Sequence, residues 1–522
     1  MLFVQLALIR WSGANLLHLS YFSNLILLAS FLGIGLGFLR STRARDLSSY
    51  TPVLLLLLIF FILLFPARIE SSSSELIFFT SVSTTGLPAW ISLPAVFLAT
   101  TVTMTGFGEI TGRAFKEFKA LTAYRWDITG SILGSVAFTT IAFFWSPPWV
   151  WSSVTLIAFF ALFGKRLPVV SAVSLILVVA MLAMESAKAG VMWSPYYKIS
   201  TRALTGQLPA SDITIPADKP ATDIWVNGIP HQLALDATSR LAYEPIYGTP
   251  YQRKTDKVFN NVLIIGAGSG SDVAIALREG AKHVDAVEID PRILKLGQDI
   301  HPDHPYADPR VSAYINDGRA FVSNSSTKYD LVLFALTDSL TLVSGASQLR
   351  LESYLFTKES IAAVREHLTP NGMFAMYNMY RQPWLVDRLA GTITQVFGHE
   401  PCVDTFDKAA TIASLTVGLQ PGDATCADGK TWTAAGSESV VSGGQVPAPA
   451  TDNWPFLYLK EPGIPALYLT IIFLVLLTSV IGIRVLGGPF RPMRKYLDLF
   501  FMGVAFLLLE TKSVTTFALL FG

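Results

Sequence analysis

The chain has 522 residues, of which 51% are hydrophobic and only 15% are charged, and its formal net charge is +1. An ordinary soluble protein is about 25% charged. The deficit is local, because residues 1–187 and 462–522 are apolar while residues 190–460 have a normal polar content. The near-zero net charge provides no broad positive field, so we expect no nucleic-acid partner.

The apolar regions predict a multispan membrane protein. A membrane-spanning helix needs roughly 20 apolar residues, or somewhat fewer when its flanks are interfacial. Nine segments qualify, at about 2–16, 20–39, 51–66, 87–109, 127–145, 149–164, 167–185, 463–483 and 497–520. Glycines in the second and fifth of them suit close helix packing, namely Gly33, Gly35, Gly37, Gly130 and Gly134. The lipid bilayer is therefore the first predicted partner.

The loops on one side of these segments carry most of the basic residues. They are Arg40, Arg43, Arg45, Arg113, Lys116, Lys119, Arg125, Lys165, Arg166, Arg484, Arg491, Arg494 and Lys495. The positive-inside rule makes these loops cytoplasmic, so residues 190–460 lie outside the cytoplasm if all nine spans exist. One span miscounted among residues 149–185 would place them inside. Cys402 and Cys426 fit either an external disulfide or two unrelated thiols.

The polar segment begins with a β-rich region over residues 190–260 and continues with alternating strands and helices. The predicted strands are 261–265, 284–289, 311–315, 330–335 and 372–378, and the predicted helices are 271–279, 291–299, 317–323, 357–367 and 384–396. This alternation is typical of a parallel sheet with helices on both faces. We therefore predict an α-helical transmembrane bundle, over 1–187 and 462–522, joined to an α/β domain over 190–460 with a small N-terminal β-segment.

A glycine turn follows the first predicted strand of the α/β domain. Residues 261–265 lead into Gly266-Ala267-Gly268-Ser269-Gly270, and the next strand ends at Glu288. Such a series places a helix N-terminus under a ligand and a carboxylate beside a ribose. Ser271 stands where a dinucleotide fingerprint requires its last glycine. After the third strand, Asp317 can accept a hydrogen bond from an adenine amino group, so three strand ends together predict a nucleoside site.

The polar segment resembles the polyamine aminopropyltransferases, or spermidine synthases, over about 220–380. The resemblance rests on VLIIGAGSG, VEIDP, INDGRAF, KYDLVLF, YLFTKES and LTPNGMF, with IWVNGIPHQ and LAYEPIY upstream. It implies a Rossmann-like fold of the class I methyltransferase type, with S-adenosylmethionine or its decarboxylated form as cosubstrate and no metal. The flanking FLGIGLGFL and AYRWDITGSILGS resemble multispan bacterial proteins in which such a domain is fused to a transporter-like membrane region.

The resemblance also implies roles for individual residues. The cosubstrate site would use Gly266, Gly268 and Gly270 at the thioether and ribose, Glu288 at the ribose hydroxyls, Asp317 and Gly318 at the adenine, and Gln232 and Tyr243 in the nucleoside and amine pocket. Asp338 matches the second acid of the family's D-S-x-D element and is the predicted catalytic residue. Ala335 stands where the first acid, the expected base, should be, and an alanine cannot accept a proton. Glu352 is either a substitute base or a salt-bridge partner.

The sequence thus predicts a bacterial inner-membrane protein whose extracytoplasmic domain transfers an alkyl group, an aminopropyl group in the family, to an amine or another acceptor. Because tethering raises the local concentration of membrane-bound partners, a lipid or a membrane protein is a further acceptor class. Two alternatives stay open. One is a methyltransferase on the same fold, favoured by Ala335, and the other is a transporter whose domain senses a nucleoside without turnover. No oligomeric state is predicted.

Overall fold

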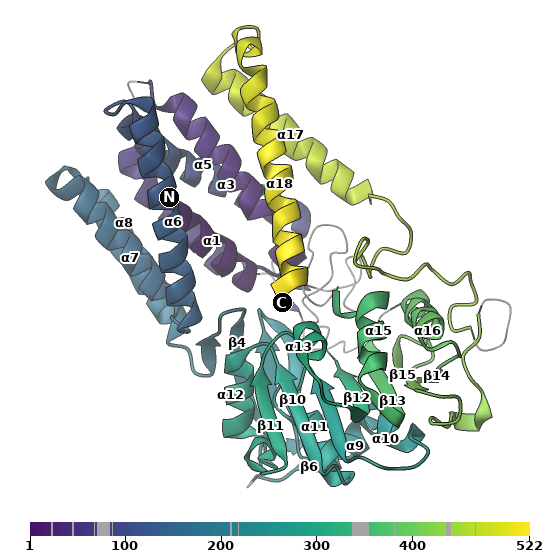
Figure 1. Ribbon diagram of the computed structural model, residues 1–522. Coiled ribbons are helices and arrows are strands. Elements are labelled where there is room, and N and C mark those ends of the chain that lie inside the picture. The colour runs from purple at the N-terminus through teal and green to yellow at the C-terminus, as the bar shows by residue number, and fades with distance from the viewer. Residues whose placement is uncertain are drawn as a thin grey trace.

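The computed structural model of the chain has two parts, a bundle of apolar helices and an α/β domain (Figure 1). It describes residues 1–21, 24–43, 46–66, 68–69, 84–85, 87–208, 211–217, 219–336, 354–380, 382–434, 440–464 and 466–521. Both ends of the chain contribute to the bundle, because the last two helices return to it after the α/β domain. The α/β domain is therefore inserted between two helical segments of one bundle.

The helices of the bundle contain between 5 and 27 residues. Its helices are α1 (Leu2–Asn15), α2 (Leu17–Tyr21), α3 (Asn24–Arg40), α4 (Thr51–Leu64), α5 (Ala89–Phe115), α6 (Ala120–Phe143), α7 (Pro148–Phe163), α8 (Val169–Ser186), α17 (Ala466–Gly487) and α18 (Leu497–Phe521), with the 3-10 turns η1 (Ser48–Tyr50), η2 (Gly164–Arg166) and η6 (Pro492–Tyr496). A two-residue pair, β1 (Arg68–Ile69) and β2 (Thr84–Thr85), lies between α4 and α5.

Fewer helices than predicted meet a strict length and hydropathy test for spanning a membrane. Among the described residues, 5 helices are long and apolar enough: Ala89–Phe115, Ala120–Phe143, Pro148–Arg166, Val169–Ser186 and Leu469–Gly487. The segments Asn24–Arg40 and Ser48–Leu64 form shorter apolar helices. The first predicted span is also short, because α1 has 14 residues and the chain leaves the helical conformation at Leu16.

Close contact between α3 and α5 depends on glycine. A Cβ added to Gly33 would lie 2.3 Å from the Thr101 carbonyl oxygen, and one added to Gly37 would lie 2.4 Å from that of Thr105. On α5, a Cβ at Gly108 would meet the Ile34 carbonyl oxygen at 2.4 Å. The prediction of close packing is confirmed for Gly33 and Gly37. It is wrong for Gly35 and Gly130, where a Cβ would meet nothing within 4 Å, because these glycines face away from the neighbouring helices.

Small antiparallel sheets precede the main sheet of the α/β domain. The strands β3 (Val191–Trp193), β4 (Lys198–Leu204), β7 (Ala221–Val226) and β8 (Ile229–Ala234) form one sheet, β5 (Gly206–Gln207) and β6 (Thr214–Ile215) form another, and α9 (Ala237–Tyr243), η3 (Pro245–Gly248) and α10 (Thr249–Arg253) follow. These strands correspond to the predicted N-terminal β-segment. They bring β8 beside the glycine turn of the main sheet.

The main sheet alternates with helices along the chain. Its strands are β9 (Asn261–Ile265), β10 (His283–Glu288), β11 (Val311–Ile315), β12 (Tyr329–Ala335), β13 (Leu368–Met379), β14 (Cys402–Thr405) and β15 (Ile412–Gly418), and the helices are α11 (Ser271–Arg278), α12 (Pro291–Ile300), α13 (Gly318–Asn324), α15 (Lys358–Glu366) and α16 (Pro383–Phe397), with η4 (Pro305–Ala307) and η5 (Ala427–Gly429). Leu263 and Ile265 pack into the core on one face, and Val262 and Ile264 into the core on the other. Both faces are therefore covered.

The strand order is β11-β10-β9-β12-β13-β15-β14. The first five strands in sequence pair in parallel, in the doubly wound order 3-2-1-4-5. This order confirms the predicted Rossmann-like domain. The five predicted strands pair in parallel as expected, whereas β14 and β15 were not predicted, and β15 pairs antiparallel with both β13 and β14. The order reverses beside β9, so the glycine turn lies at the topological switch point where such sheets bind ligands.

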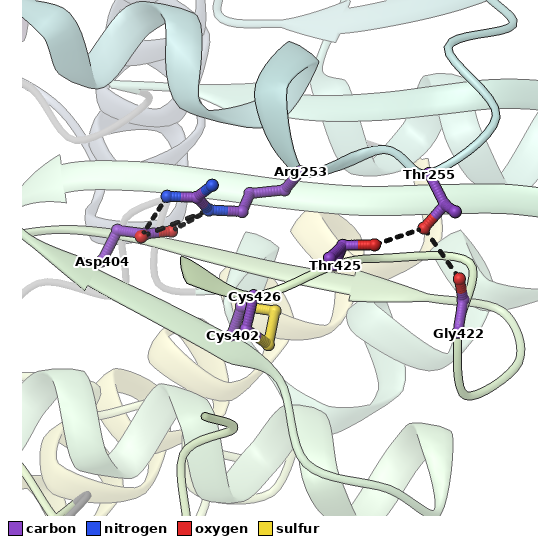
Figure 2. Close-up of a disulfide and its surroundings, with 7 residues drawn as sticks. All are labelled: Arg253, Thr255, Cys402, Asp404, Gly422, Thr425 and Cys426. Atoms are coloured by element: carbon purple, nitrogen blue, oxygen red, sulfur yellow. Dashed lines mark hydrogen bonds and ion pairs between the residues drawn. A yellow bond between two sulfur atoms is a disulfide. The ribbon is translucent and has the colours of Figure 1, made fainter. Parts of the chain in front are cut away.

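A disulfide fastens the last strands to the loop that follows them. Cys402 on β14 is joined to Cys426, as Figure 2 shows. Nearby, the Arg253 guanidinium donates to both carboxylate oxygens of Asp404, at 2.7 to 3.2 Å. The Thr255 hydroxyl donates to the Gly422 carbonyl oxygen at 2.7 Å. Of the two alternatives for the cysteines, the structure therefore has the disulfide.

Candidate functional site

The glycine turn between β9 and α11 forms the centre of the candidate site. Gly266, Gly268 and Gly270 have φ angles of 79°, 55° and 101°, a region that side chains with a Cβ rarely adopt. The turn lets the chain reverse sharply from the end of β9 into the first turn of α11. The amides at the start of that helix consequently point towards the carboxyl edge of the sheet, where they favour an electron-rich ligand.

Two of these glycines are also required by the protein's own side chains. A Cβ at Gly268 would lie 2.1 Å from Gln232 Nε2, and one at Gly270 would lie 2.9 Å from the Tyr306 ring. Gln232, on β8, accepts a hydrogen bond from the Ser269 amide at 2.8 Å. The structure thus brings the predicted pocket residue Gln232 onto the turn. Contact of these glycines with a ligand stays a prediction.

Glu288 ends β10 and points back towards the glycine turn. Its Oε2 accepts from the Gly268 amide at 2.8 Å, and its Oε1 accepts from the Asp290 amide at 2.9 Å. Burial raises the pKa of Glu288 to about 7, although the backbone hydrogen bonds oppose this rise. A carboxylate offers about four acceptor positions, so those two bonds leave capacity for further donors, such as ribose hydroxyls.

The end of β11 supplies the adjoining part of the predicted site. Asp317 caps α13, where its side chain accepts from the Ala320 amide at 2.9 Å, and burial raises its pKa. Gly318 follows, and a Cβ there would lie 2.3 Å from the Ile265 side chain. The Asn316 amide donates to the Glu288 carbonyl oxygen at 3.1 Å, which ties this strand end to the previous one. The predicted Glu288, Asp317 and Gly318 are therefore brought together at one edge.

Tyr196 is a residue of this edge that the sequence did not identify. It lies in the turn between β3 and β4, and its side chain is 47% exposed, so a ligand can reach it. Burial of its hydroxyl raises its pKa, and the charges of Asp290, Asp317 and Glu288 raise it further. The negative charge of these three carboxylates therefore acts on the hydroxyl. The turn SPYY directly after the apolar segment was the available signal, but it matches no motif with a known mechanism.

A second group missed by the sequence lies beneath the glycine turn. The Tyr377 hydroxyl donates to Asp272, which is in the first turn of α11, and the Tyr247 and Tyr377 rings lie 5.2 Å apart. Burial raises the pKa of Asp272 to about 6, against the opposing effects of the Tyr377 hydrogen bond and the Arg240 charge. All four side chains are buried, so we assign them to supporting the turn.

The predicted catalytic residue lies outside the described residues. Asp338 and the alternative base Glu352 both fall in 337–353, and their roles stay predictions. Ala335 is described: it ends β12, is buried, and is paired in register with Tyr377. Tyr243, at the end of α9, packs against an apolar cluster that contains Leu208 and Leu235. Its predicted place in the amine pocket likewise stays a prediction.

The described edge presents carboxylates, backbone amides and a tyrosine hydroxyl. The carboxylate and hydroxyl oxygens can accept hydrogen bonds from a sugar and an exocyclic amine, the backbone amides can donate, and the negative charge of the carboxylates favours a cationic ligand. Within the described residues, no group of three or more histidine, cysteine, aspartate or glutamate side chains could hold a metal ion. The carboxylates, amides and hydroxyl at this edge therefore fit recognition of a nucleoside.

Part of the α/β domain is similar to a known family. Residues 244–410 match the sequence model of the spermine/spermidine synthase domain. This match confirms the predicted resemblance for the α/β domain and lies wholly outside the helical bundle. It places the glycine turn, Glu288, Asp317 and Ala335 inside a domain of this kind.

Individual relatives agree with the family match. The polyamine aminopropyltransferase of Alkaliphilus metalliredigens is 35% identical over 121 residues, which are 23% of this chain and 39% of that protein. That of Prochlorococcus marinus is 33% identical over 147 residues, 26% of this chain and 48% of the relative. The chain thus spans less than half the length of these curated relatives. The spermidine synthase structure from Thermotoga maritima is 15% identical, with a TM-score of 0.32 over 45% of this chain and 73% of that one.

Proposed function

We propose that the α/β domain binds decarboxylated S-adenosylmethionine at the carboxyl edge of its main sheet and transfers the aminopropyl group to an amine. The observation that carries the proposal is the position of Glu288, which is fixed at the switch point between two backbone amides and retains acceptor capacity. The match of residues 244–410 to the spermine/spermidine synthase domain supports the same cosubstrate class.

Each part of the proposed cosubstrate meets a suitable group. Ribose hydroxyls would donate to Glu288, and the adenine amino group would donate to Asp317. The sulfonium, which carries a positive charge, would lie in the negative field of Glu288, Asp290 and Asp317 beside Tyr196. Transfer forms a bond from the acceptor nitrogen to the propyl carbon, breaks the carbon–sulfur bond, and releases methylthioadenosine together with a proton from the nitrogen.

The proton acceptor distinguishes the two transfer reactions. Ala335 supplies no base at the strand end where the family has an acid, so we propose Asp338 for that role. The same alanine favours the second candidate function, transfer of a methyl group from S-adenosylmethionine, in which an acceptor without an ionised amine needs no such base.

Calorimetric titration of the full-length protein in lipid nanodiscs tests the proposal. We expect decarboxylated S-adenosylmethionine and methylthioadenosine to bind, and S-adenosylmethionine to bind more weakly. Mass spectrometry of an incubated amine would then show an added aminopropyl group. Failure of all three nucleosides to bind refutes the proposed function, whereas binding of S-adenosylmethionine with methyl addition establishes the second candidate.

We further propose that the bundle spans a membrane and that the α/β domain lies outside the cytoplasm. Apolar side chains such as Leu133, Phe143, Phe473 and Leu508 are more than half exposed on the bundle surface, as a surrounding bilayer requires. The basic loops meet at one end: Arg113 donates to the Arg43 carbonyl oxygen and Arg43 to that of Val485.

That basic end faces away from the α/β domain. The α7–α8 and α17–α18 turns lie on the far side of the bundle from the main sheet (Figure 1). Under the positive-inside rule, the basic end is cytoplasmic, which leaves the α/β domain on the opposite side. The disulfide between Cys402 and Cys426 supports the same side, because disulfides persist in oxidising compartments.

Labelling of introduced cysteines tests this orientation. In Lys295→Cys the thiol is on the exposed face of α12, and in the matched control Arg491→Cys it is in the basic α17–α18 connection. A membrane-impermeant maleimide applied to spheroplasts should label the first variant and not the second until the membrane is permeabilised. The reverse pattern would place the α/β domain in the cytoplasm and contradict the proposal.

A further inference from the structure

A bundle arginine contacts the segment that leads into the α/β domain. Arg10, on α1, donates to the carbonyl oxygen of Ser194, which follows β3. Its guanidinium lies 4.9 Å from the Trp151 ring centre and 5.8 Å from that of Trp193. These rings also contact each other edge to face, 5.3 Å apart. Arg10 is thus held between one bundle helix, α7, and the first strand after the bundle.

The contact continues from Ser194 to the nucleoside site. The Ser194 hydroxyl donates to Asp290 Oδ2. Asp290 is fully buried and caps α12, accepting from the Arg292 amide at 2.8 Å. The amide of Asp290 is in turn one of the two donors that hold Glu288. An unbroken series of hydrogen bonds therefore runs from Arg10 through Ser194 and the backbone of residue 290 to the predicted ribose carboxylate.

Two further contacts hold the same junction. Glu185, at the end of α8, accepts from the Trp11 indole at 2.8 Å and from the Lys198 ammonium of β4. The Arg292 guanidinium, on α12, lies 4.9 Å from the centre of the Trp145 ring in the α6–α7 connection. The start of α12 therefore contacts the bundle directly through Arg292, and Glu185 holds the neighbouring strand β4 to the bundle.

We propose that Arg10 is a positioning residue for the nucleoside site: through Ser194 and Asp290 it fixes the amide that holds Glu288, so the bundle sets the nucleoside affinity of the α/β domain. The role in affinity rests on the proposed function, whereas the mechanical link does not. Coupling is reciprocal in such a linkage, so a ligand at Glu288 also stabilises the contacts of Arg10 with the bundle.

The physical basis is compensation of buried charge. Asp290 has no exposed surface, and its carboxylate is stabilised by the Ser194 hydroxyl, by two amides of α12 and by the positive charge of Arg10. Removing that charge leaves a less compensated buried carboxylate, which relaxes towards water or takes up a proton. Either response loosens the start of α12 and, with it, the amide of residue 290.

Hydrogen–deuterium exchange of the full-length protein in nanodiscs tests the link without any ligand. In Arg10→Met we expect faster exchange in peptides that contain the amides of Gly268, Asp290 and Arg292. The matched control is Arg43→Met, which removes an arginine that also donates to backbone carbonyl oxygens but lies in the basic loops. Equal exchange at these amides in wild type and Arg10→Met overturns the proposal.

A second variant covers the case in which Arg10→Met loosens the whole bundle. Ser194→Ala removes the hydroxyl, which donates to Asp290 and accepts from the amides of the following turn, and it keeps the carbonyl contact with Arg10. We expect the same local increase in exchange with the bundle unchanged. Exchange in Ser194→Ala that matches the wild type at every amide near Glu288 also overturns the proposal.

Titration with methylthioadenosine then measures the functional consequence. We expect binding about tenfold weaker in Arg10→Met, within the usual range of coupling between sites, partly restored in Arg10→Lys, and unchanged in Arg43→Met. In turnover, KM for the cosubstrate should rise while kcat changes little. If the wild type binds no nucleoside, the proposed function fails and the exchange data alone decide the link. If it binds and Arg10→Met binds equally well, the positioning role is wrong.

Discussion

The bundle and the α/β domain each bury a glutamate, and they neutralise it in different ways. Glu109, on α5, has no exposed side-chain surface and accepts from Arg40 at 2.9 Å and from Arg113 at 2.6 Å. Glu288 is 7% exposed, and its described partners are the backbone amides of Gly268 and Asp290. Two cations of the chain neutralise the Glu109 carboxylate, whereas neutral backbone amides orient the Glu288 carboxylate.

This difference separates a structural charge from a binding charge. Two arginines satisfy Glu109 fully, and their side chains join α3, α5 and the basic loop. Burial raises the pKa of Glu288, and its partners among the described residues are neutral amides, so a ligand that brings donors and positive charge gains from reaching it. Burial alone therefore does not identify the site, whereas the type of partner does.

The largest expected effect comes from removing the structural charge, which is that of Glu109. Glu109→Gln leaves Arg40 and Arg113 without their buried counter-ion, so the free energy of unfolding should fall by about 4 kcal/mol. Thermal unfolding in nanodiscs measures the change. Methylthioadenosine binding at temperatures below the transition should stay at the wild-type value, because Glu109 lies at the end of the bundle away from the α/β domain. Loss of methylthioadenosine binding without loss of stability would contradict the distinction between a structural Glu109 and a binding Glu288.

Removal of the disulfide should lower the stability of the α/β domain and leave that of the bundle unchanged. Cys402 and Cys426 close a loop 24 residues apart in sequence, and a constraint of that length stabilises a fold by about 3 kcal/mol. In Cys402→Ser/Cys426→Ser we expect the α/β domain to unfold at a lower temperature and the bundle transition to stay in place. Differential scanning calorimetry with and without reductant checks this. An equal shift of both transitions would show that the two regions unfold as one unit.

Removal of the binding charge has the next largest effect. Glu288→Gln offers one acceptor oxygen where the carboxylate offers two charged oxygens, so methylthioadenosine binding should weaken about 100-fold, as expected for the loss of one hydrogen bond to a charged group. Titration calorimetry measures it. Glu359→Gln, an acid of α15 outside the nucleoside site, is the matched control and should bind as the wild type does. Equal binding by Glu288→Gln and the wild type would assign Glu288 a structural role like that of Glu109.

The pH dependence of binding is the smallest expected effect. Because the pKa of Glu288 is raised to about 7, its ionised fraction rises about tenfold between pH 6 and pH 8. Binding of methylthioadenosine, which does not titrate in this range, should strengthen by about the same factor, and Glu288→Gln should show a flat profile. A flat profile in the wild type would count against Glu288 as the acceptor.

The stability of the fold should fall as the pH rises, whereas the binding of methylthioadenosine should strengthen. The folded pKa of Glu288 lies above the ordinary value of 4.5. Its contribution to the free energy of unfolding is therefore present below about pH 4.5 and lost as the pH rises through about 7. Thermal unfolding of the wild type against Glu288→Gln at pH 5 and pH 8 checks this sign. A wild type that gains stability relative to the variant with rising pH would contradict it.

Local patterns were sufficient to predict the centre of the α/β domain. Apolar runs marked the strands, and the glycine turn after residues 261–265 and the acid Glu288 marked strand ends. Parallel strands bring their carboxyl ends to one edge, so Glu288 and Asp317 could be placed together from sequence alone. The Gln232 contact with the turn was accessible only through the family resemblance, because it depends on a separate sheet packing beside β9.

Contacts between distant segments could not be predicted in this way. Arg10 contacts Ser194, which is 184 residues away, and aromatic residues of other elements. The periodicity of a sequence contains no information on contacts between such distant segments. The strands β14 and β15 were missed because β14 is a short strand at the edge of the sheet, and because the antiparallel pairing of β15 with β13 and β14 depends on register rather than composition. Gly35 and Gly130 were misassigned for a similar reason, since the sequence gives the helix but not which face its neighbour covers.

The most direct test of the nucleoside site is a cryo-EM map of the full chain in nanodiscs with methylthioadenosine bound. The account predicts ligand density at the carboxyl edge of the main sheet, with the ribose hydroxyls at Glu288 and the adenine amino group at Asp317. Density elsewhere, or an edge closed by Gln232 and Tyr306 with Glu288 out of the ligand's reach, would contradict it.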